Sequence, residues 1–467
     1  MLLRRIPEGY NEGWNAYWAQ VAWQGGELYP SPGAAISNNY PPLSFYLVGA
    51  LGQLIGDNIF AGRIVSELSL VAIAGCIGTW IRAIGMPRSL AVFSGTLFLA
   101  AFASFASDYI GENDPQMLAH AITIAGATIL WRFEFSRRAV ITGCLLIVCG
   151  VLTKHLLLPV PIAVTVWIAL YRRDRLTLWL ITSAIAGVLA LAILWHSFGI
   201  VFFHDLLSSR VYLRWRVLSR VLQAGQAFGW LLILGAGAVL PAIRRDTSRK
   251  LGQFATFTLL YLAVAAAIGS LAVGGRGVDQ NAFFDTLIAG VLALSAAAGY
   301  LTARLALPGQ RAASLAGITL IATSCGVILT WAAVQRWPSD WRAIEDADAR
   351  EAQTLTLLQT IRSLGPDATA CEQLSLCYWA HTHFKVDFFN FGQKLATGAL
   401  PADSCLRFFS PDSVRLIQSD TALAGSRTLI SRMLTPRCND ELLQLYVPVA
   451  HSADGTIFRP ARSRVPR

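Results

Sequence analysis

The chain has 467 residues, of which 54% are hydrophobic and only 14% are charged. Soluble domains carry about 25% charged residues, so this composition and a mean hydropathy of +0.50 exclude an ordinary soluble protein. The net charge of +10 does not indicate nucleic-acid binding, because the basic residues lie in short connections between apolar segments. We therefore expect an integral membrane protein that has no nucleic-acid partner.

Long apolar segments predict about ten membrane-spanning helices, because each crossing needs about 20 residues. The apolar stretch between 139 and 171 is too long for one span and short for two. It is interrupted at Lys154 and His155 and again by prolines, so two short helices that meet near Lys154 fit it best. The expected spans are 62–84, 89–107, 115–132, two within 139–171, 176–198, 227–243, 253–272, 285–304 and 313–333.

The basic residues occur in every second connection between these spans. Cytoplasmic connections are rich in Lys and Arg, so the side with the basic residues is predicted to face the cytoplasm, in an inner (plasma) membrane. The N-terminal 60 residues, the loop 200–226 and everything after about 336 are then expected outside the cytoplasm. Such a topology places the other polar connections together at one outer face.

Two segments of this outer face are predicted to be helices that do not cross the membrane. Residues 12–24 are expected to form an amphipathic helix with its aromatic side chains at the interface, where such rings prefer to lie. Residues 42–56 are too short for a span and are expected to lie on the membrane surface. The aromatic residues of the first segment are Trp14, Tyr17, Trp18 and Trp23.

The beginning of the chain, MLLRRIPEGYNEG, carries no obvious signal for exporting an N-terminus. Residues 1–6 look like the end of a helix, so we expect the natural protein to start upstream with a further transmembrane helix. The alternative is that the following span pulls a short N-terminus across the membrane.

The region 337–467 is polar and mixed, and it is predicted to form a small extracytoplasmic α/β domain after a membrane domain of residues 1–336. We expect a helix over 339–365 that Ser339 caps, and strands within 413–420 and 442–450. Disulfides are plausible in an oxidising compartment, and sequence proximity makes Cys371 and Cys377 the first candidate pair. The other cysteines of this region are Cys405 and Cys438, whereas Cys76, Cys144, Cys149 and Cys325 lie in apolar spans.

Acidic residues concentrate in the outer segments. Glu12 begins the predicted helix 12–24. It is either a charge that the helix dipole stabilises at the N-terminus or a base that accepts a proton from an attacking hydroxyl. Asp108, Glu112 and Asp114 form a turn between two spans. This turn is either a solvated connection or a carboxylate group that orients an acceptor. A divalent cation there is possible, but the ligand set is incomplete, so no metal site is predicted.

Basic residues in the outer connections are candidates for binding phosphate. Lys154 lies at the predicted helix break, where it can reach the interface or bind phosphate as a point charge. The arginines of the loop 200–226 suit either bulk lipid headgroups or a dedicated phosphate, and Arg276 in a glycine-rich turn is favoured over each of them. The full candidate set is Lys154, His155, Arg210, Arg214, Arg276, Asp279, Gln280 and Asn281.

Five motifs occur in an order that resembles the GT-C superfamily of polytopic glycosyltransferases. They are NEGWNAYWAQ, GGELYP, NNYPPLSFYLVGALGQLIGD, AGRIVS and LTKHLLLPVP. The similarity covers about residues 10–170 and points to bacterial relatives of protein O-mannosyltransferases and the lipid A aminoarabinose transferase. It implies a GT-C-like helical bundle with outer-face amphipathic helices.

The resemblance also implies an activity and a set of site residues. Family members transfer a sugar from a polyprenyl-phosphate carrier at the outer membrane face, with a catalytic carboxylate from an acidic pair. This pair falls on Asn11 and Glu12; because Asn11 replaces the usual Asp, Glu12 carries the role alone or shares it with Glu8. The neighbouring loop residues expected near the acceptor are Asn11, Asn38, Asn39 and Tyr40.

We therefore expect an inverting, polyprenyl-phosphate-dependent glycosyltransferase that needs no nucleotide. Arg276, Lys154 or Arg210 would stabilise the leaving phosphate. The acceptor is an envelope glycan, a glycolipid or a protein. The alternative is a non-catalytic transporter or flippase for a lipid-linked substrate, since a broken helix is also a transporter trait. The absence of an evident repeat and the large outer region favour the enzyme.

Overall fold

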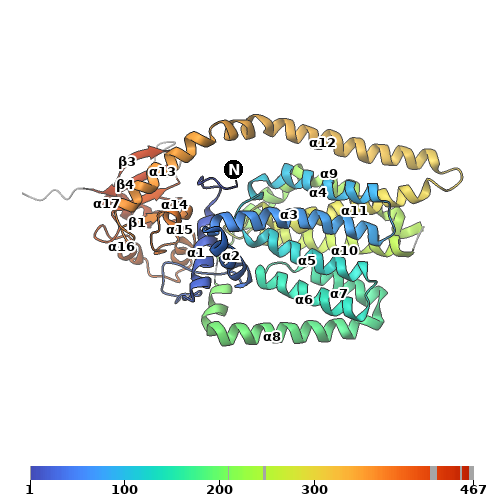
Figure 1. Ribbon diagram of the computed structural model, residues 1–467, viewed down its shortest axis with the longest axis horizontal. Helices are drawn as coiled ribbons and strands as arrows, with labels where there is room; N and C mark the ends of the chain where they lie inside the picture. Colours follow the sequence, from blue (N-terminus) through green and yellow to red (C-terminus); the bar gives the residue numbers. More distant parts are fainter. Residues whose placement is uncertain (1, 209, 246–248, 421–428, 453–454, 462–467) are drawn as a thin grey trace, which may run out of the picture.

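The computed structural model describes residues 2–208, 210–245, 249–420, 429–452 and 455–461. Within these residues, seven helices are long and apolar enough to cross a membrane, and three shorter or less apolar helices pack among them. All ten predicted spans are helices of one bundle, and seven of them have the length and hydropathy of a membrane crossing (Figure 1). The seven are α3 (Asn58–Ala83), α4 (Arg88–Ala106), α8 (Arg173–Leu206), α9 (Arg214–Arg245), α10 (Arg249–Ala272), α11 (Phe284–Arg304) and α12 (Arg311–Glu345); the three are α5 (Pro115–Arg132), α6 (Arg137–Thr153) and α7 (Pro159–Tyr171).

Helix α11 is the centre of the bundle, and its residues from Phe284 to Tyr300 are all buried. Helices α8 and α12 run along opposite sides of the bundle and leave most of their apolar side chains exposed (Figure 1). A helix with an exposed apolar surface of this kind is stable in contact with lipid. The break between α6 and α7 lies at Lys154, as expected from the sequence.

Helices α1 (Tyr10–Gln24) and α2 (Leu43–Ile55) lie between the bundle and the C-terminal region (Figure 1). The prediction that Trp14, Tyr17 and Trp18 lie at a lipid interface is wrong, because all three are buried. Tyr17 stacks on Phe384, a residue of the C-terminal region, with ring centroids 4.7 Å apart. The aromatic face of α1 therefore binds protein rather than lipid.

Gly13 permits the close packing of α1 on the C-terminal region. A Cβ atom at this position would lie 2.1 Å from the backbone of Leu374 and Ser375. Only a glycine can bring two backbones this close. This contact fixes the C-terminal region over the N-terminal segment.

The C-terminal region is a small α/β unit, as predicted. Its sheet has the order β1-β2-β4-β3, with β1 and β2 parallel and the other pairs antiparallel. The elements are α13 (Ala347–Ser363), β1 (Thr369–Cys371), α14 (Leu374–Trp379), α15 (Phe388–Ala396), α16 (Ser404–Phe408), β2 (Leu416–Ser419), α17 (Pro436–Leu445), β3 (Tyr446–Ser452) and β4 (Gly455–Pro460).

Two boundaries differ from the sequence predictions. Ser339 caps no helix: α12 runs through it to Glu345, and the Ser339 hydroxyl donates to the carbonyl of Arg336. The predicted strand 442–450 is helical up to Leu445, because Thr435 caps α17 and Pro436 occupies its first turn.

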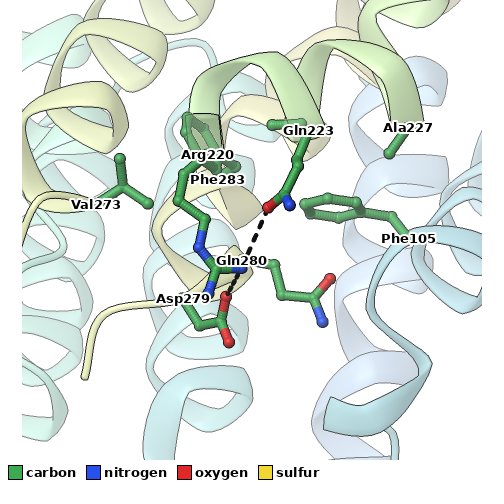
Figure 2. Close-up of a pocket in the computed structure, with 9 residues that line it drawn as sticks. Phe105, Arg220, Gln223, Ala227, Val273, Asp279, Gln280 and Phe283 are labelled. Carbon is green, nitrogen blue, oxygen red and sulfur yellow. Dashed lines mark hydrogen bonds and ion pairs between the residues drawn. The ribbon is translucent and has the colours of Figure 1, made fainter. Parts of the chain in front are cut away.

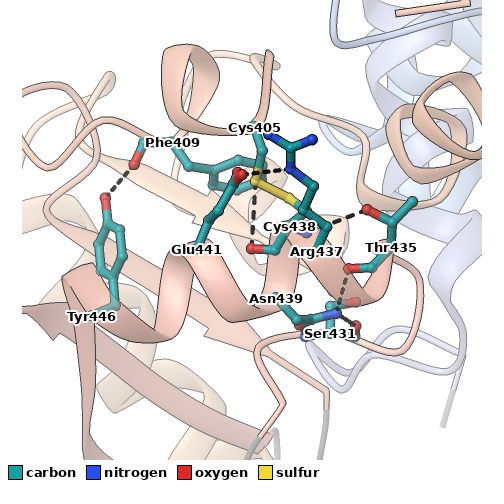
Figure 3. Close-up of a disulfide and its surroundings, with 9 residues drawn as sticks. All are labelled: Cys405, Phe409, Ser431, Thr435, Arg437, Cys438, Asn439, Glu441 and Tyr446. Atoms are coloured by element: carbon teal, nitrogen blue, oxygen red, sulfur yellow. Dashed lines mark hydrogen bonds and ion pairs between the residues drawn. A yellow bond between two sulfur atoms is a disulfide. The ribbon is translucent and has the colours of Figure 1, made fainter. Parts of the chain in front are cut away.

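Two disulfides stabilise the C-terminal region. The predicted pair Cys371–Cys377 is present, and a second bridge joins Cys405 of α16 to Cys438 of α17 (Figure 3). The hydroxyl of Tyr446 donates to the carbonyl of Phe409 beside this second bridge. The four cysteines of the apolar spans are free thiols, as expected.

Candidate active site

A cavity of about 340 Å³ forms where the broken helix meets the ends of α8, α10 and α11. One part of its wall is polar and contains three basic side chains, and another part is apolar. The polar lining residues include Asn39, Tyr40, Gln116, Lys154, His155, Arg210, Asn281 and Asp285, and the apolar ones include Leu156, Leu157, Pro159, Leu206, Ile268, Leu271 and Ala272.

Lys154 is held at the cavity wall by an ion pair. Its ammonium lies 3.1 and 3.4 Å from the two carboxylate oxygens of Asp114 and 4.5 Å from the centre of the Tyr40 ring. Asp114 also caps α5, because its Oδ1 accepts from the amide of Gln116 at 2.7 Å. The break after α6 exposes the Lys154 ammonium to the cavity, and Asp114 fixes its position.

Two further basic side chains line the same cavity. Burial and the charges of Lys154 and Arg210 lower the pKa of His155, in the loop after α6, to about 4. His155 is therefore a neutral imidazole near pH 7. The guanidinium of Arg210 lies over the ring of Phe389, 5.5 Å from its centre. The cationic groups that remain available to an anion are Lys154 and Arg210.

Glu12 lies in a closed ion pair outside the cavity. Its carboxylate oxygens each accept at 2.7 Å from Arg63, one from Nε and the other from Nη2. The backbone amides of Glu8 and Asn113 complete its coordination, at 3.0 and 3.3 Å. Glu12 and Arg63 are 0% and 1% exposed, so this carboxylate is inaccessible to a substrate in the structure.

The loop 110–114 carries a second acid close to this pair. Burial, followed by the charges of Asp114 and Glu12, raises the pKa of Glu112 well above its usual range. Among the described residues, its carboxyl group has no hydrogen-bond or ion-pair partner. A Cβ at Gly9 would lie 2.4 Å from Glu112 Oε1, so the carboxyl group contacts the segment that leads into α1.

Several predicted site residues lie away from the cavity. Arg276 donates to the carbonyl of Arg432 at 2.8 Å and so joins the C-terminal region to the bundle. Asp279 pairs at 2.9 Å with Arg220 in a separate pocket that Gln280 also lines (Figure 2). Arg214 is exposed at the start of α9. The main cavity is lined by none of these four residues, Arg276, Asp279, Gln280 and Arg214.

Most of the remaining predicted residues make contacts within the loops and helix ends of the outer segments. Asp108 is exposed and lies 3.6 Å from Arg336. Asn38 is buried and bridges its own loop, since it donates to the Leu28 carbonyl and accepts from the Tyr40 amide. The Asn11 carbonyl accepts from Asn15 within α1. Of the four expected acceptor-loop residues, Asn39 and Tyr40 line the cavity.

The sequence interpretation missed Arg63, Gln116 and Asp285. Arg63 stands at the start of an apolar span, and such a position is a usable signal because a charge inside a membrane helix needs a partner. Asp285 follows the candidates Asp279, Gln280 and Asn281 in the sequence, but its link to the cavity depends on contacts between distant helices. Within the described residues, no group of three or more His, Cys, Asp or Glu side chains is placed to hold a metal ion.

The chain matches no protein-family model and no curated protein sequence. Its fold is similar to that of ArnT from Cupriavidus metallidurans bound to undecaprenyl phosphate. The identity is 14% over 98% of this chain and 96% of that chain, with a TM-score of 0.56. The Archaeoglobus fulgidus oligosaccharyltransferase in the apo form gives a TM-score of 0.51 at 11% identity, over 99% of this chain and 72% of that chain. The chain thus shares the fold of these two proteins, which confirms the helical bundle with a small C-terminal α/β unit that the resemblance of its motifs predicted.

Proposed function

We propose that this protein transfers a sugar from a polyprenyl-phosphate carrier to an acceptor at the outer face of the membrane. The observation that carries this proposal is the cavity itself, which joins two cationic side chains, Lys154 and Arg210, to an apolar wall. A polyprenyl phosphate has the same division, with a dianionic head and a long hydrocarbon tail. The similar fold of ArnT, whose structure contains undecaprenyl phosphate, supports this assignment.

Lys154 and Arg210 bind the carrier phosphate in this proposal. The Asp114 carboxylate occupies one side of the Lys154 ammonium and leaves further N–H bonds for phosphate oxygens. The carrier tail follows the apolar residues after the helix break, where Leu156 and Leu158 are 47% and 44% exposed. Negative charge that develops on the leaving phosphate is then stabilised by cations already in position.

Glu112 is the proton acceptor in this proposal. It is 7% exposed and lies outside the lining of the cavity, against the segment before α1, so the acceptor must displace this segment to reach it. The acceptor oxygen or nitrogen attacks the anomeric carbon, the bond from that carbon to the phosphate oxygen breaks, and the acceptor proton passes to Glu112. A single displacement inverts the anomeric carbon and releases the polyprenyl phosphate. A buried carboxylate with a raised pKa is a stronger base than an exposed one, which suits this role.

Glu12 acts through Glu112 rather than on the substrate. It accepts from the amide of Asn113, and its own carbonyl accepts from the Asn113 side chain at 3.1 Å. These bonds hold the loop that carries Glu112 against α1. Glu12 is thus a positioning residue, and the role first expected for it falls to a neighbouring acid.

The placement of the acids also favours an enzyme over a transporter. Glu12, Glu112 and Asp114 gather at one end of the bundle, beside α1 and the C-terminal region, instead of spreading along the helices. A transport pathway would place ionisable groups near the membrane centre. We place this end of the bundle outside the cytoplasm on the basis of the basic residues at the opposite connections.

The proposal is tested with membranes that contain the full chain and radiolabelled undecaprenyl-phosphate sugars. Transfer is measured as loss of the labelled donor, release of undecaprenyl phosphate and appearance of label in an envelope glycan, glycolipid or protein. Wild-type membranes should consume at least one donor, and Glu112→Gln membranes should consume it at least about a hundredfold more slowly. Equal donor consumption by the two would refute the proposed chemistry.

A further inference from the structure

A second acid, Asp285, lies in the wall of the donor cavity and has no role in the mechanism above. It stands in the first turn of α11, directly after the short helix η2 (Gln280–Phe283). The hydroxyl of Tyr261, on α10, donates to its Oδ1. Tyr261 is 0% exposed and the Asp285 side chain is 9% exposed. A ligand can therefore reach this carboxylate from the cavity.

Helix α5 completes the setting of this acid. The amide nitrogen of Gln116 contacts Nε2 of His120 at 3.0 Å. The amide nitrogen is only a donor, so Nε2 is the acceptor and His120 carries its proton on Nδ1. Nδ1 lies 3.8 Å from Asp285 Oδ1, beyond hydrogen-bond distance, and it has no partner among the described residues.

Asp285 therefore has one oxygen bound by Tyr261 and one that has no hydrogen-bond partner in the described part of the chain. No Lys or Arg forms an ion pair with it there. An acid in this position is costly to keep in a membrane protein unless a ligand uses it. Its neighbours at the cavity wall, Gln116 and Asn281, add amide groups that both donate and accept.

We propose that Asp285 recognises the sugar of the donor, with Gln116 and Asn281 beside it. This inference rests on the proposed function of the same cavity. A carboxylate accepts hydrogen bonds from two neighbouring sugar hydroxyls, which suits a polyol better than a phosphate, because a phosphate would be repelled. The cavity is then divided into a cationic part at Lys154 and Arg210 for the phosphate and an acidic part at Asp285 for the sugar.

If the cavity is divided in this way, a change at Asp285 should affect the binding of the sugar-loaded carrier and of the bare carrier differently. Binding is measured on the full chain in nanodiscs with undecaprenyl phosphate and with its glucose, mannose and arabinose esters. Wild-type protein should bind at least one ester more tightly than the bare carrier. Asp285→Asn should weaken binding of that ester by about tenfold or more, because a charge-assisted hydrogen bond is lost. It should not weaken binding of the bare carrier, because it removes a charge that repels the phosphate.

Tyr261→Phe and Asp174→Asn provide the controls. Tyr261→Phe removes the hydroxyl that orients Asp285 and should weaken binding of the ester alone, to a smaller extent. Asp174 is 62% exposed at the start of α8, so Asp174→Asn should change neither affinity. Binding of the bare carrier that is at least as tight as in wild-type protein also shows that the Asp285→Asn protein is folded.

Three results would overturn the inference. They are equal binding of bare and loaded carrier by wild-type protein, an equal loss of both in Asp285→Asn, and an unchanged preference for the ester in that variant. A wild-type protein that binds neither the bare carrier nor any ester would instead refute the proposed function.

Discussion

The guanidinium of Arg63 and the carboxylate of Glu12 form a two-bond ion pair that is fully closed to solvent. The other N–H groups of Arg63 donate to the carbonyls of Arg4 and Ile6, at 2.9 and 2.7 Å. One arginine of α3 therefore holds both α1 and the segment before it. In the proposed mechanism, Glu12 therefore supports the site, and the acceptance of a proton that the sequence suggested for Glu12 is assigned to Glu112.

Glu12→Gln should mainly reduce stability. Removing one partner of a buried pair leaves the other charge uncompensated and costs about 3–5 kcal/mol. We expect a lower thermal midpoint and less folded protein, while the folded fraction retains its pH dependence. Glu134→Gln is the matched control, because Glu134 is 61% exposed and pairs with Lys250 at the surface. A Glu12→Gln protein with wild-type stability and no activity would restore Glu12 as the base.

The transfer rate should depend on pH through Glu112. The base must be ionised, so kcat/KM should rise with pH and level off above the pKa of Glu112. Because burial raises that pKa, the half-maximal rate should lie well above 4.5, the ordinary value of a glutamate. A pH–rate profile of wild-type protein and Glu112→Gln checks this. An ordinary carboxylate pKa, or the same rising limb in the variant, would exclude Glu112.

The two disulfides should contribute unequally to stability. The Cys405–Cys438 bridge spans 33 residues and the Cys371–Cys377 bridge spans 6. Loop-closure entropy predicts losses of about 4 and about 2 kcal/mol when each bridge is removed. Thermal unfolding of the exported full chain, with each pair of cysteines replaced by serine in turn, measures which bridge contributes more to stability. Non-reducing peptide mapping that finds all four thiols free would contradict both bridges.

The topology can be checked by labelling single engineered cysteines with an impermeant reagent. Sites next to Asp108 and Asp279 should react in intact cells, and a site next to Arg137 only after permeabilisation. A chain with the native free cysteines and no engineered site gives the background. The opposite labelling pattern would place the cavity on the cytoplasmic side and reverse the proposed orientation.

The sequence predicted the apolar helices and the presence of the small α/β region well, because apolar length and composition determine them, whereas the helix boundaries near Ser339 and Thr435 were not identified. Lys154, Asp114 and Tyr40 were each singled out, but not their contact, which joins segments that are distant in the chain. Burial of Trp14 was missed for a related reason. An aromatic helix face looks the same in sequence whether it packs on lipid or on a domain that follows some 350 residues later.

The polar groups inside the bundle were hardest to predict. Tyr261 and His120 are single polar residues in apolar spans, and nothing local indicates that both approach Asp285. Arg276 shows the opposite case: its glycine-rich turn is typical of phosphate binding, but the side chain joins the C-terminal region to the bundle. Long-range contacts therefore decide which polar residues reach the cavity.

The most direct test of the account is native mass spectrometry of the purified full chain with added undecaprenyl phosphate. Lys154→Gln removes the charge but keeps a donor for Asp114, and Lys250→Gln removes a lysine that is 58% exposed and distant from the cavity. The account predicts one bound carrier in wild-type and Lys250→Gln protein, and at least about tenfold weaker binding in Lys154→Gln and Arg210→Gln. Equal occupancy in all four proteins, or no bound carrier in wild-type protein, would contradict it.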